Sequence, residues 1–246
     1  MEPMIDLTNK KIVVTGASSG IGRAVCILLS QLGAKVMLTG RKEEELSNTL
    51  EQMAGEGHCC FPYDLSDLDN IGSLIGDIVD SDGKKLDGLV HCAGISVRAP
   101  IRNLDYAKMD AVMKINFYAF VELVKQYAHK NSNGGSIVGI SSYAAINGAK
   151  GQTMYAASKA ALDAAVISMS KELYKKQIRI NSVRPGFVNT AMYENSKKQL
   201  GNDKLGEDQL LGVGEPEDVA NLIAFLLSDA SRFITGSNYL INGGSC

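Results

Sequence analysis

The sequence predicts an α/β protein built on a doubly wound parallel sheet of about seven strands, with helices on both faces. Two observations support this fold class: short apolar runs alternate with longer segments of helical periodicity, and neither a repeat nor a low-complexity stretch interrupts them. Strands separated by helices of this size form parallel crossovers, whose helices cover the sheet. Because no Pro/Gly/Ser-rich linker divides the 246 residues, we expect a single domain over residues 1–246.

The elements can be assigned in order from the N-terminus. The first predicted strand is Lys11–Thr15 (KIVVT), and a glycine-rich turn over Gly16–Gly22 leads into a helix that ends at Gly33. A second strand, Lys35–Thr39, precedes a charged helix over Lys42–Met53. The remaining elements are strand His58–Tyr63, helix Asp67–Val79, strand Gly88–His91, a helical region Tyr106–His129, strand Ser136–Ser141, helix Tyr155–Tyr174, strand Arg179–Val183, helix Pro216–Leu227 and strand Asn238–Ile241.

Composition and charge exclude several classes of protein. The net charge is −2 and no basic stripe is present, which argues against a nucleic-acid partner. No apolar run approaches the ~20 residues that a membrane-spanning helix needs. The N-terminal segment MEPMIDLTNKK lacks the apolar region of a signal peptide, so we expect a cytoplasmic protein.

The cysteines and histidines show no metal-ligand pattern. Five cysteines are an odd number and unevenly spaced, which suits free thiols in a reducing compartment. The adjacent pair Cys59–Cys60 favours strand packing over redox chemistry. The three histidines share no ligand spacing with the cysteines, so we predict no metal site. The residues concerned are Cys26, Cys59, Cys60, Cys92, Cys246, His58, His91 and His129.

Tyr155 and Lys159 stand four residues apart in a predicted helix, so their phenol and ammonium groups lie on one face. A free tyrosine has a pKa of ~10, and a nearby fixed cation lowers that pKa. Ser142, at the end of an apolar strand, offers a hydroxyl to a carbonyl oxygen. The three side chains predict a general acid/base site. The alternative is an ordinary amphipathic helix with a buried tyrosine and a lysine that reaches solvent.

The turn after the first strand carries glycines at positions 16, 20 and 22 in TGASSGIG. Glycines between a strand and a helix allow a tight turn and bring backbone N–H groups close to a pyrophosphate at the helix N-terminus. The spacing differs from the commoner dinucleotide-binding fingerprint, and many glycine-rich turns are turns only. Its position directly after the first strand favours nucleotide binding.

Taken together, the motifs resemble those of the short-chain dehydrogenase/reductase family over nearly the whole chain. Ser142 and Tyr155 stand thirteen residues apart, as the family pattern requires. The residues that carry the resemblance are Thr15-Gly16-x-x-x-Gly20-x-Gly22, Asp64, Ala93-Gly94, Asn116 in KINFYAF, Ser142 in ISSYA, Tyr155-x-x-x-Lys159 and Pro185-Gly186 in INSVRPGFV. The resemblance implies a three-layer Rossmann fold. One departure is His91-Cys92 before Ala93-Gly94, where members usually have two asparagines; we expect His91 to be a structural hydrogen-bond donor.

The resemblance also implies the roles of the site residues. Tyr155 exchanges a proton with the substrate oxygen as hydride is transferred, and Ser142 holds that oxygen. Lys159 lowers the Tyr155 pKa and holds the nicotinamide ribose, while Asn116 supports a water that relays protons to Lys159. The residues expected at the nucleotide are Gly16, Ser18, Ser19, Gly20, Ile21, Gly22 and Arg41, Asp64 and Leu65 at the adenine, Ala93 and Gly94 at the adenosine ribose, Pro185, Gly186, Val188 and Thr190 at the nicotinamide, and Tyr155 and Lys159.

The end of the second strand predicts NADP(H) rather than NAD(H). An NAD-selective site places an acid there, which binds the ribose 2′-hydroxyl and would repel a 2′-phosphate. Gly40 occupies that place, and Arg41 offers a planar donor fork suited to phosphate. The alternative is that Arg41 begins a solvated helix face, as Glu43–Glu45 does.

The substrate is the least determined part of the prediction. We expect residues 189–211, a polar segment, to form a lid, and Ala144, Ile146, Gln152, Met192 and Tyr193 to line the substrate pocket. The chain is similar to 3-oxoacyl-[acyl-carrier-protein] reductases, but sugar, steroid or small-ketone dehydrogenases carry the same motifs. An acidic carrier would need a basic surface, to which Arg98, Arg102, Lys150, Lys197 and Lys198 could contribute.

Small residues on the Tyr155 helix predict a homo-oligomer, a tetramer or dimer. Ala156, Ala160 and Ala164 form one row and Ala157, Ala161 and Ala165 another, while Leu162, Val166 and Met169 continue the inner face. The alternative is helix propensity and tight packing on the sheet.

Two function classes remain: an NADP(H)-dependent carbonyl reductase or alcohol dehydrogenase, and a non-catalytic nucleotide-binding sensor on the same fold.

Overall fold

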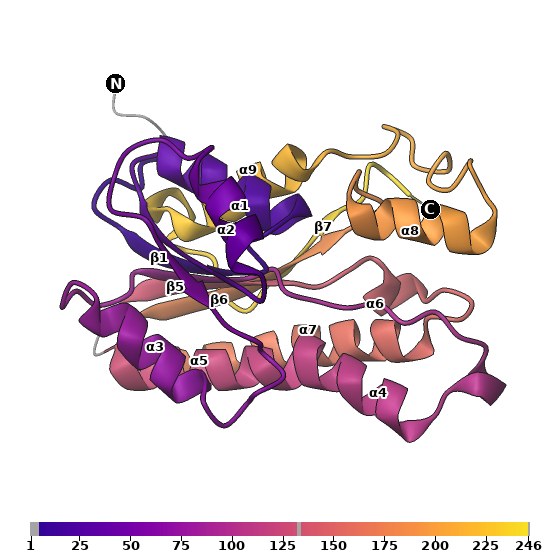
Figure 1. The fold of residues 1–246 in the computed structure, drawn as a ribbon, viewed down its shortest axis with the longest axis horizontal. Helices are drawn as coiled ribbons and strands as arrows, with labels where there is room; N and C mark the ends of the chain where they lie inside the picture. The colour runs from indigo at the N-terminus through magenta and orange to yellow at the C-terminus, as the bar shows by residue number, and fades with distance from the viewer. Residues whose placement is uncertain (1–4, 132–133, 246) are drawn as a thin grey trace.

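The computed structural model describes residues 5–131 and 134–245 (Figure 1). Residues 1–4, the start of the N-terminal segment MEPMIDLTNKK, lie outside the described residues, and so does Cys246. One sheet contains seven strands in the order β3-β2-β1-β4-β5-β6-β7, and every neighbouring pair is parallel. The predicted sheet is therefore confirmed. The strands are β1 (Lys11–Thr15), β2 (Lys35–Gly40), β3 (Cys59–Pro62), β4 (Gly88–His91), β5 (Gly135–Ile140), β6 (Ile178–Pro185) and β7 (Asn238–Ile241).

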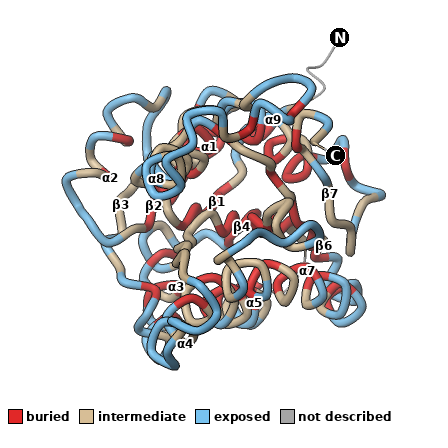
Figure 2. Tube along the Cα trace, turned by 90° about the vertical axis from the view of Figure 1, so that its right-hand side faces the viewer, coloured by how far each residue is buried: buried red, intermediate tan, exposed pale blue. Residues whose placement is uncertain are grey.

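Helices cover both faces of the sheet and make three layers (Figure 1). One face carries α1 (Gly20–Gln31), α2 (Glu43–Leu50) and α9 (Pro216–Leu227). The other carries α3 (Ile71–Asp80), α5 (Ala119–Lys130) and α7 (Thr153–Leu173). The buried positions gather along the sheet and the inner helix faces (Figure 2). This is the three-layer Rossmann arrangement that the sequence predicts.

The hydrophobic core consists of two clusters, one on each side of the sheet. Successive strand residues point to opposite faces, so Val14 packs toward α1 and α9, while Val13 packs toward α3 and α5. Leu38 and Met37 of β2 divide in the same way. Because both faces are covered, the strands are nearly continuous apolar runs rather than alternating ones.

The helical region predicted over Tyr106–His129 is not one α-helix. It consists of α4 (Tyr106–Met113), a π-helical turn η2 (Lys114–Tyr118) and α5. A π-helical turn accommodates one extra residue and interrupts the regular ladder of backbone hydrogen bonds. The interruption centres on Asn116, whose buried side chain bonds to residues outside its own helix. Hydrophobic periodicity alone could not show this break.

Other differences concern short elements and element ends. The polar segment 189–211 contains a helix, α8 (Ala191–Leu200), whose N-cap Thr190 accepts a hydrogen bond from the Tyr193 N–H at 3.3 Å. A further short helix, α6 (Ala144–Asn147), follows β5. Besides the π-helical turn η2, the described residues contain the 3₁₀ turns η1 (Ile101–Asn103), η3 (Tyr174–Lys176) and η4 (Asp229–Ser231). In the part of the chain that the structure describes, no helix has the length and apolar character needed to span a membrane.

The fold places the candidate site at the carboxyl ends of the strands. The strand order reverses between β1 and β4, and ligands of open α/β sheets bind in the crevice outside such a switch point. The glycine-rich turn follows β1, and Ala93 and Gly94 follow β4. The sheet topology therefore brings these two segments, distant in sequence, to the same edge.

Candidate active site

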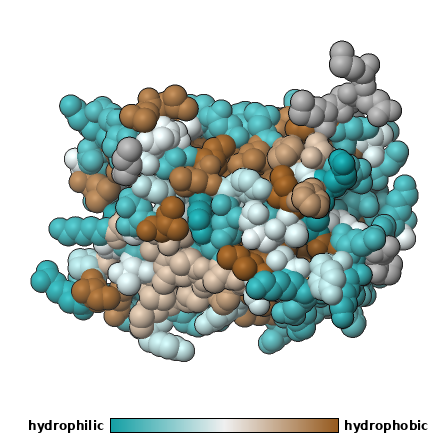
Figure 3. Space-filling model, turned by 180° about the vertical axis from the view of Figure 1, so that it is seen from behind, coloured by the Kyte–Doolittle hydropathy of each residue, from teal (hydrophilic) through white to brown (hydrophobic). Residues whose placement is uncertain are grey.

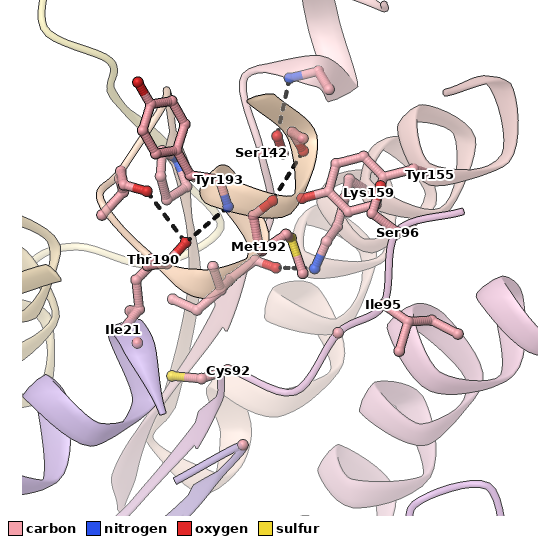
Figure 4. Close-up of a pocket in the computed structure, with 18 of the residues that line it drawn as sticks. Ile21, Cys92, Ile95, Ser96, Ser142, Tyr155, Lys159, Thr190, Met192 and Tyr193 are labelled. Carbon is pink, nitrogen blue, oxygen red and sulfur yellow. Dashed lines mark hydrogen bonds between the residues drawn. The ribbon is translucent and has the colours of Figure 1, made fainter. Parts of the chain in front are cut away.

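A cavity of about 1120 Å³ opens at the carboxyl ends of the strands (Figure 4). All the nucleotide and substrate residues predicted from the sequence line it, except Ile146. Ile146 lies on α6, is 55% exposed and is not among the residues that line this cavity. Of the four predicted catalytic residues, Asn116 is fully buried behind the wall, and the other three face the cavity.

The glycine-rich turn is shaped by close backbone contact. Gly16 has a φ of 66°, and a Cβ there would lie 2.7 Å from the backbone nitrogen of Ala93. Ser19, the N-cap of α1, makes no side-chain capping bond, and residues 18–22 line the cavity. The first N–H groups of a helix without such a cap are available to an anion. The turn thus has the construction of a phosphate-binding site.

Tyr155, Ser142 and Lys159 meet at the other end of the cavity (Figure 4). Burial raises the pKa of the Tyr155 phenol, and its hydrogen bond with Ser142 partly opposes that rise. The predicted lowering of this pKa by Lys159 is therefore wrong for the chain by itself. Burial of the phenol is the larger effect. The Lys159 ammonium donates to the Ile140 carbonyl at 2.6 Å and lies 5.8 Å from the centre of the Tyr155 ring.

Lys159 is only 3% exposed, and burial lowers its pKa from 10.5 to about 8, against the opposing influence of Cys92 and Asp163. Because this pKa is lower in the folded chain than in the unfolded chain, the buried charge destabilises the fold below about pH 8. That penalty falls as the pH rises from about 8 to 10.5 and is absent above 10.5. The buried Lys159 ammonium, which lines the cavity, therefore lowers the stability of the fold near neutral pH.

We expect Lys159→Met to raise the unfolding free energy near neutral pH by about 1–2 kcal/mol. Removal of the buried charge contributes up to ~3 kcal/mol, and loss of the hydrogen bond to Ile140 offsets ~1 kcal/mol. Urea denaturation of both proteins at equal concentration, repeated at several pH values, measures the difference. The gain should shrink as the pH approaches 10.5. A variant that is less stable than the parent at every pH would contradict the prediction.

Asn116 ties the π-helical turn to two other segments. Its Oδ1 accepts from the Ile95 N–H at 2.8 Å, and its Nδ2 donates to the Ile95 carbonyl at 3.0 Å and to Ser158 Oγ at 2.9 Å. Both amide hydrogens are thus used. A water that relays protons to Lys159 would have to bind Oδ1 or the main-chain carbonyl. A Cβ on Gly94 would lie 3.4 Å from both Asn116 Oδ1 and the Lys159 ammonium.

His91 is fully buried, and its ring bonds to the neighbouring strand β1 and does not line the cavity. Its Nδ1 lies 2.9 Å from Thr15 Oγ1, and that oxygen also accepts from the Ala93 N–H at 3.2 Å. Burial lowers the His91 pKa to about 3, with a further contribution from Lys159, so the ring is neutral. His91 connects the ends of β1 and β4 in place of the usual asparagine.

Arg41, Gly40 and Asp64 line the cavity at and after the carboxyl ends of β2 and β3. The Ser66 N–H donates to Asp64 at 2.9 Å and lowers the pKa of that carboxyl, and Arg41 lowers it further. A Cβ on Gly40 would lie 3.6 Å from Ser18 Oγ. An acidic side chain at position 40 would thus project toward the glycine-rich turn, and this chain has none there.

The structure adds lining residues that the sequence analysis missed. Ala107, Asp110, Ala111 and Lys114 on and after α4 form part of the wall, as do Asn202, Lys204 and Asp208 beyond α8. The i, i+4 spacing of Ala107 and Ala111 was a usable signal, because two small residues on one helix face leave room beside them. Nothing in the polar segment beyond α8 distinguished its lining residues from solvated ones.

The cysteines that the structure describes, at positions 26, 59, 60 and 92, are free thiols. Cys59 and Cys60 lie on β3 and pack against the two core clusters, as predicted. Cys92 lines the cavity. Within residues 5–131 and 134–245, no three His, Cys, Asp or Glu side chains are arranged to hold a metal ion.

Comparison with known proteins gives consistent matches over nearly the full length. A family model described as enoyl-(acyl carrier protein) reductase matches residues 16–245. The chain is 36% identical to a 3-oxoacyl-[acyl-carrier-protein] reductase of Thermotoga maritima, covering 97% of this chain and 98% of the relative. It is 34% identical to nodulation protein G of a Rhizobium species, with 98% of each covered.

Solved structures agree with the sequence matches. A short-chain type dehydrogenase/reductase from Mycobacterium ulcerans superposes with a TM-score of 0.90 at 32% identity, over 98% of this chain and 91% of that one. A dehydrogenase/reductase from Sinorhizobium meliloti gives a TM-score of 0.91 at 32% identity, over 98% and 97%.

Proposed function

Because this chain belongs to the short-chain dehydrogenase/reductase family of oxidoreductases, we propose that it uses NADP(H) to interconvert a ketone and a secondary alcohol. The observation that carries the proposal is the position of Ser142, Tyr155 and Lys159 in one cavity with the glycine-rich turn. A phosphate-binding turn and a proton donor in the same cavity suit hydride transfer to a carbonyl group. A sensor that only binds the nucleotide would have no need of Ser142, Tyr155 and Lys159 together in one cavity.

The residues present fit a nicotinamide dinucleotide. The turn residues 16–22 would hold the pyrophosphate, Arg41 the 2′-phosphate, Asp64 and Leu65 the adenine, and Ala93 and Gly94 the adenosine ribose. Pro185, Gly186, Val188 and Thr190 would contact the nicotinamide end, where NADPH supplies the hydride. Position 186 suits a glycine, because a Cβ there would lie 2.9 Å from the Asn242 Cα.

Tyr155 acts on the substrate oxygen. Its raised pKa keeps the phenol protonated near neutral pH, which is the form that can donate a proton as charge develops on the oxygen. Ser142 donates a hydrogen bond to the same oxygen. Lys159, with Asn116 behind it, holds the nicotinamide ribose and replaces the proton that Tyr155 gives up.

The same pKa predicts a pH asymmetry between the two directions. Reduction needs the protonated phenol, so its kcat/KM should be insensitive to the Tyr155 ionisation near neutral pH. Oxidation needs the phenolate, so its kcat/KM should rise about tenfold per pH unit below the Tyr155 pKa, until another step limits it. Steady-state kinetics in both directions over one pH series measures this. An oxidation rate that is flat with pH would contradict the assignment.

We propose a 3-oxoacyl-[acyl-carrier-protein] or a related acyl thioester as the substrate. The support is that relatives at 36% identity are 3-oxoacyl-[acyl-carrier-protein] reductases. The family model's description names an enoyl reductase instead. Reduction of a ketone places the developing charge on its oxygen, which the hydroxyls of Tyr155 and Ser142 can stabilise.

Residues 189–211 would form the lid over this substrate, within a single domain over residues 1–246. Thr190, near the start of this segment, lies close to the glycine-rich turn, because a Cβ on Gly20 would lie 3.1 Å from the Thr190 methyl group. The Tyr193 hydroxyl donates to the Leu205 carbonyl at 2.8 Å, which ties α8 to the segment after it. Ala144, Gln152, Met192 and Tyr193 would contact the substrate.

The partners we propose are an acidic carrier protein and further copies of the chain in the cytoplasm. In the α7 rows Ala157 and Ala164 are exposed and the other four alanines are half-buried, while Leu162 and Val166 are buried. Weakly apolar residues gather on the face seen in Figure 3. This distribution supports a homotetramer or homodimer through α7.

Arg98, which donates to the Lys150 carbonyl at 2.8 Å, lies with Arg102 among the basic residues available to a carrier.

Loss of NADPH absorbance tests the function across a panel of 3-oxoacyl thioesters, enoyl thioesters, sugars, steroids and small ketones. We expect the 3-oxoacyl thioesters to give the highest kcat/KM and the enoyl thioesters none. Turnover of enoyl thioesters alone would replace the carbonyl assignment with alkene reduction. Nucleotide binding without turnover of any member would favour the sensor.

A further inference from the structure

Asp163 is a buried carboxylate one helical turn beyond Lys159 on α7, and the mechanism above does not use it. Its side chain is 4% exposed. Oδ2 accepts from Arg184 Nε at 2.7 Å and lies 2.8 Å from Ser141 Oγ, and Oδ1 lies 2.6 Å from Ser182 Oγ. A buried charge is tolerated only when it is paired and hydrogen-bonded, and this one is.

Two of these partners, Ser141 and Arg184, adjoin a residue of the candidate site. Ser141 precedes Ser142, and Arg184 precedes Pro185 in β6. Ser141 Oγ also lies 3.1 Å from the carbonyl oxygen of Lys159. One carboxylate therefore connects the strand end that carries Ser142, the helix turn that carries Lys159, and the strand end that leads to the nicotinamide contacts.

Asp163 differs in charge from the other titratable groups near Lys159. The titratable groups of the described residues that influence Lys159 or face it are Tyr155 and Asp163 on α7, and His91 and Cys92 at the end of β4. The Cys92 pKa is raised to about 12 by burial, the His91 pKa is lowered to about 3, and the Tyr155 pKa is raised. All three are neutral near neutral pH. Asp163 is then the anion that faces Lys159.

We infer that Asp163 is a positioning residue of this site: its carboxylate fixes Ser141 and Arg184 against α7, and its charge keeps Lys159 protonated. The inference rests on the proposed role of Lys159 in turnover, but its test needs no turnover. The Asp163 carboxylate lies four residues after Lys159 on α7 and attracts the Lys159 ammonium. Hydrogen bonds with Ser141, Ser182 and Arg184 hold this carboxylate in place. Loss of that charge leaves the cation buried with no anion among the groups that influence it.

The test is a direct titration of Lys159. Protein labelled with ¹³C at the lysine Cε is followed by NMR over a pH series, and the Lys159 signal is the one absent from Lys159→Met. In Asp163→Asn, which keeps the size of the side chain, we expect the Lys159 midpoint to fall by about one pH unit or more. A midpoint within about 0.2 units of the parent protein, a shift far smaller than one close charge produces, would overturn the inference.

Asp82→Asn is the matched control. Asp82 is also a part-buried carboxylate, paired with Lys11 and with Lys35 at 2.8 Å, but Lys11 begins β1 at the amino end of the sheet, away from the cavity. Its loss should reduce stability and leave the Lys159 midpoint unchanged. An equal shift in this control would mean that general loosening moves the titration, and the inference would fail.

Asp163→Asn leaves Arg184 unpaired, so the single variant could fold poorly. The double variant Asp163→Asn/Arg184→Met removes both charges of the pair, a replacement that buried ion pairs often tolerate. The Lys159 midpoint should still fall, because the missing anion is Asp163 in both. A midpoint that returns to the parent value would assign the shift to unpaired Arg184 and overturn the role of Asp163. If turnover fails on every substrate while the midpoint moves, the proposed function fails and this inference stands.

Discussion

Tyr155→Phe is expected to lower kcat/KM for carbonyl reduction by roughly 10³-fold or more, at unchanged NADPH affinity. The substitution removes the hydroxyl that gives the proton and keeps the ring that fills the cavity wall. General acid catalysis contributes about 10²–10⁴-fold in enzymes of known mechanism. Steady-state kinetics gives the first quantity, and quenching or transfer of NADPH fluorescence gives the second.

A matched variant separates chemistry from packing. Tyr143→Phe removes a phenol hydroxyl from a tyrosine that also lines the cavity, one residue after Ser142. Its kcat/KM should stay within about threefold of the parent, since no transferred proton depends on it. If Tyr155→Phe turns over at the parental rate, the acid/base assignment fails. If it loses nucleotide binding together with turnover, Tyr155 contributes to the cofactor site and not to proton transfer alone.

Arg41→Ala should weaken NADPH binding by about 10–100-fold and NADH binding by less than about threefold. A charge-assisted hydrogen bond contributes about 1.5–3 kcal/mol, and NADH lacks the phosphate that would accept it. The exposed position of Arg41 places the effect toward the lower end of that range, because solvent and salt screen the interaction. Titration with both nucleotides at one ionic strength gives the ratio.

Lys42→Ala is the control for this effect. Lys42 is the next residue, equally exposed, but it does not line the cavity. It should change the two affinities by similar small factors. Equal weakening of NADPH and NADH by Arg41→Ala would remove the basis for NADP(H) selectivity. Reversal of the preference by Gly40→Asp, which adds the missing acid, would support it further.

The sequence predicted much of the arrangement because the relevant signals are local. The apolar runs of β1, β2 and β4 and the helical periods between them follow from neighbouring residues, and a parallel sheet follows from their alternation. The Tyr155–Lys159 spacing needs only one helix to bring the pair to one face. The glycine-rich turn likewise depends on a short segment whose backbone must pass close to another.

Tertiary structure decided the properties that depend on burial and on contacts between distant residues. The π-helical turn at Asn116 is associated with bonds to Ile95 and Ser158, which no local pattern shows. The neutral state of His91 follows from its full burial beside residues distant in sequence, among them Thr15, which lies 76 positions away. The direction of the Tyr155 pKa followed from removal of the phenol from water, an effect stronger than a cation that is directed at Ile140. Sequence spacing shows which groups can meet, whereas their charge states depend on the solvent and the neighbours that the folded chain leaves them.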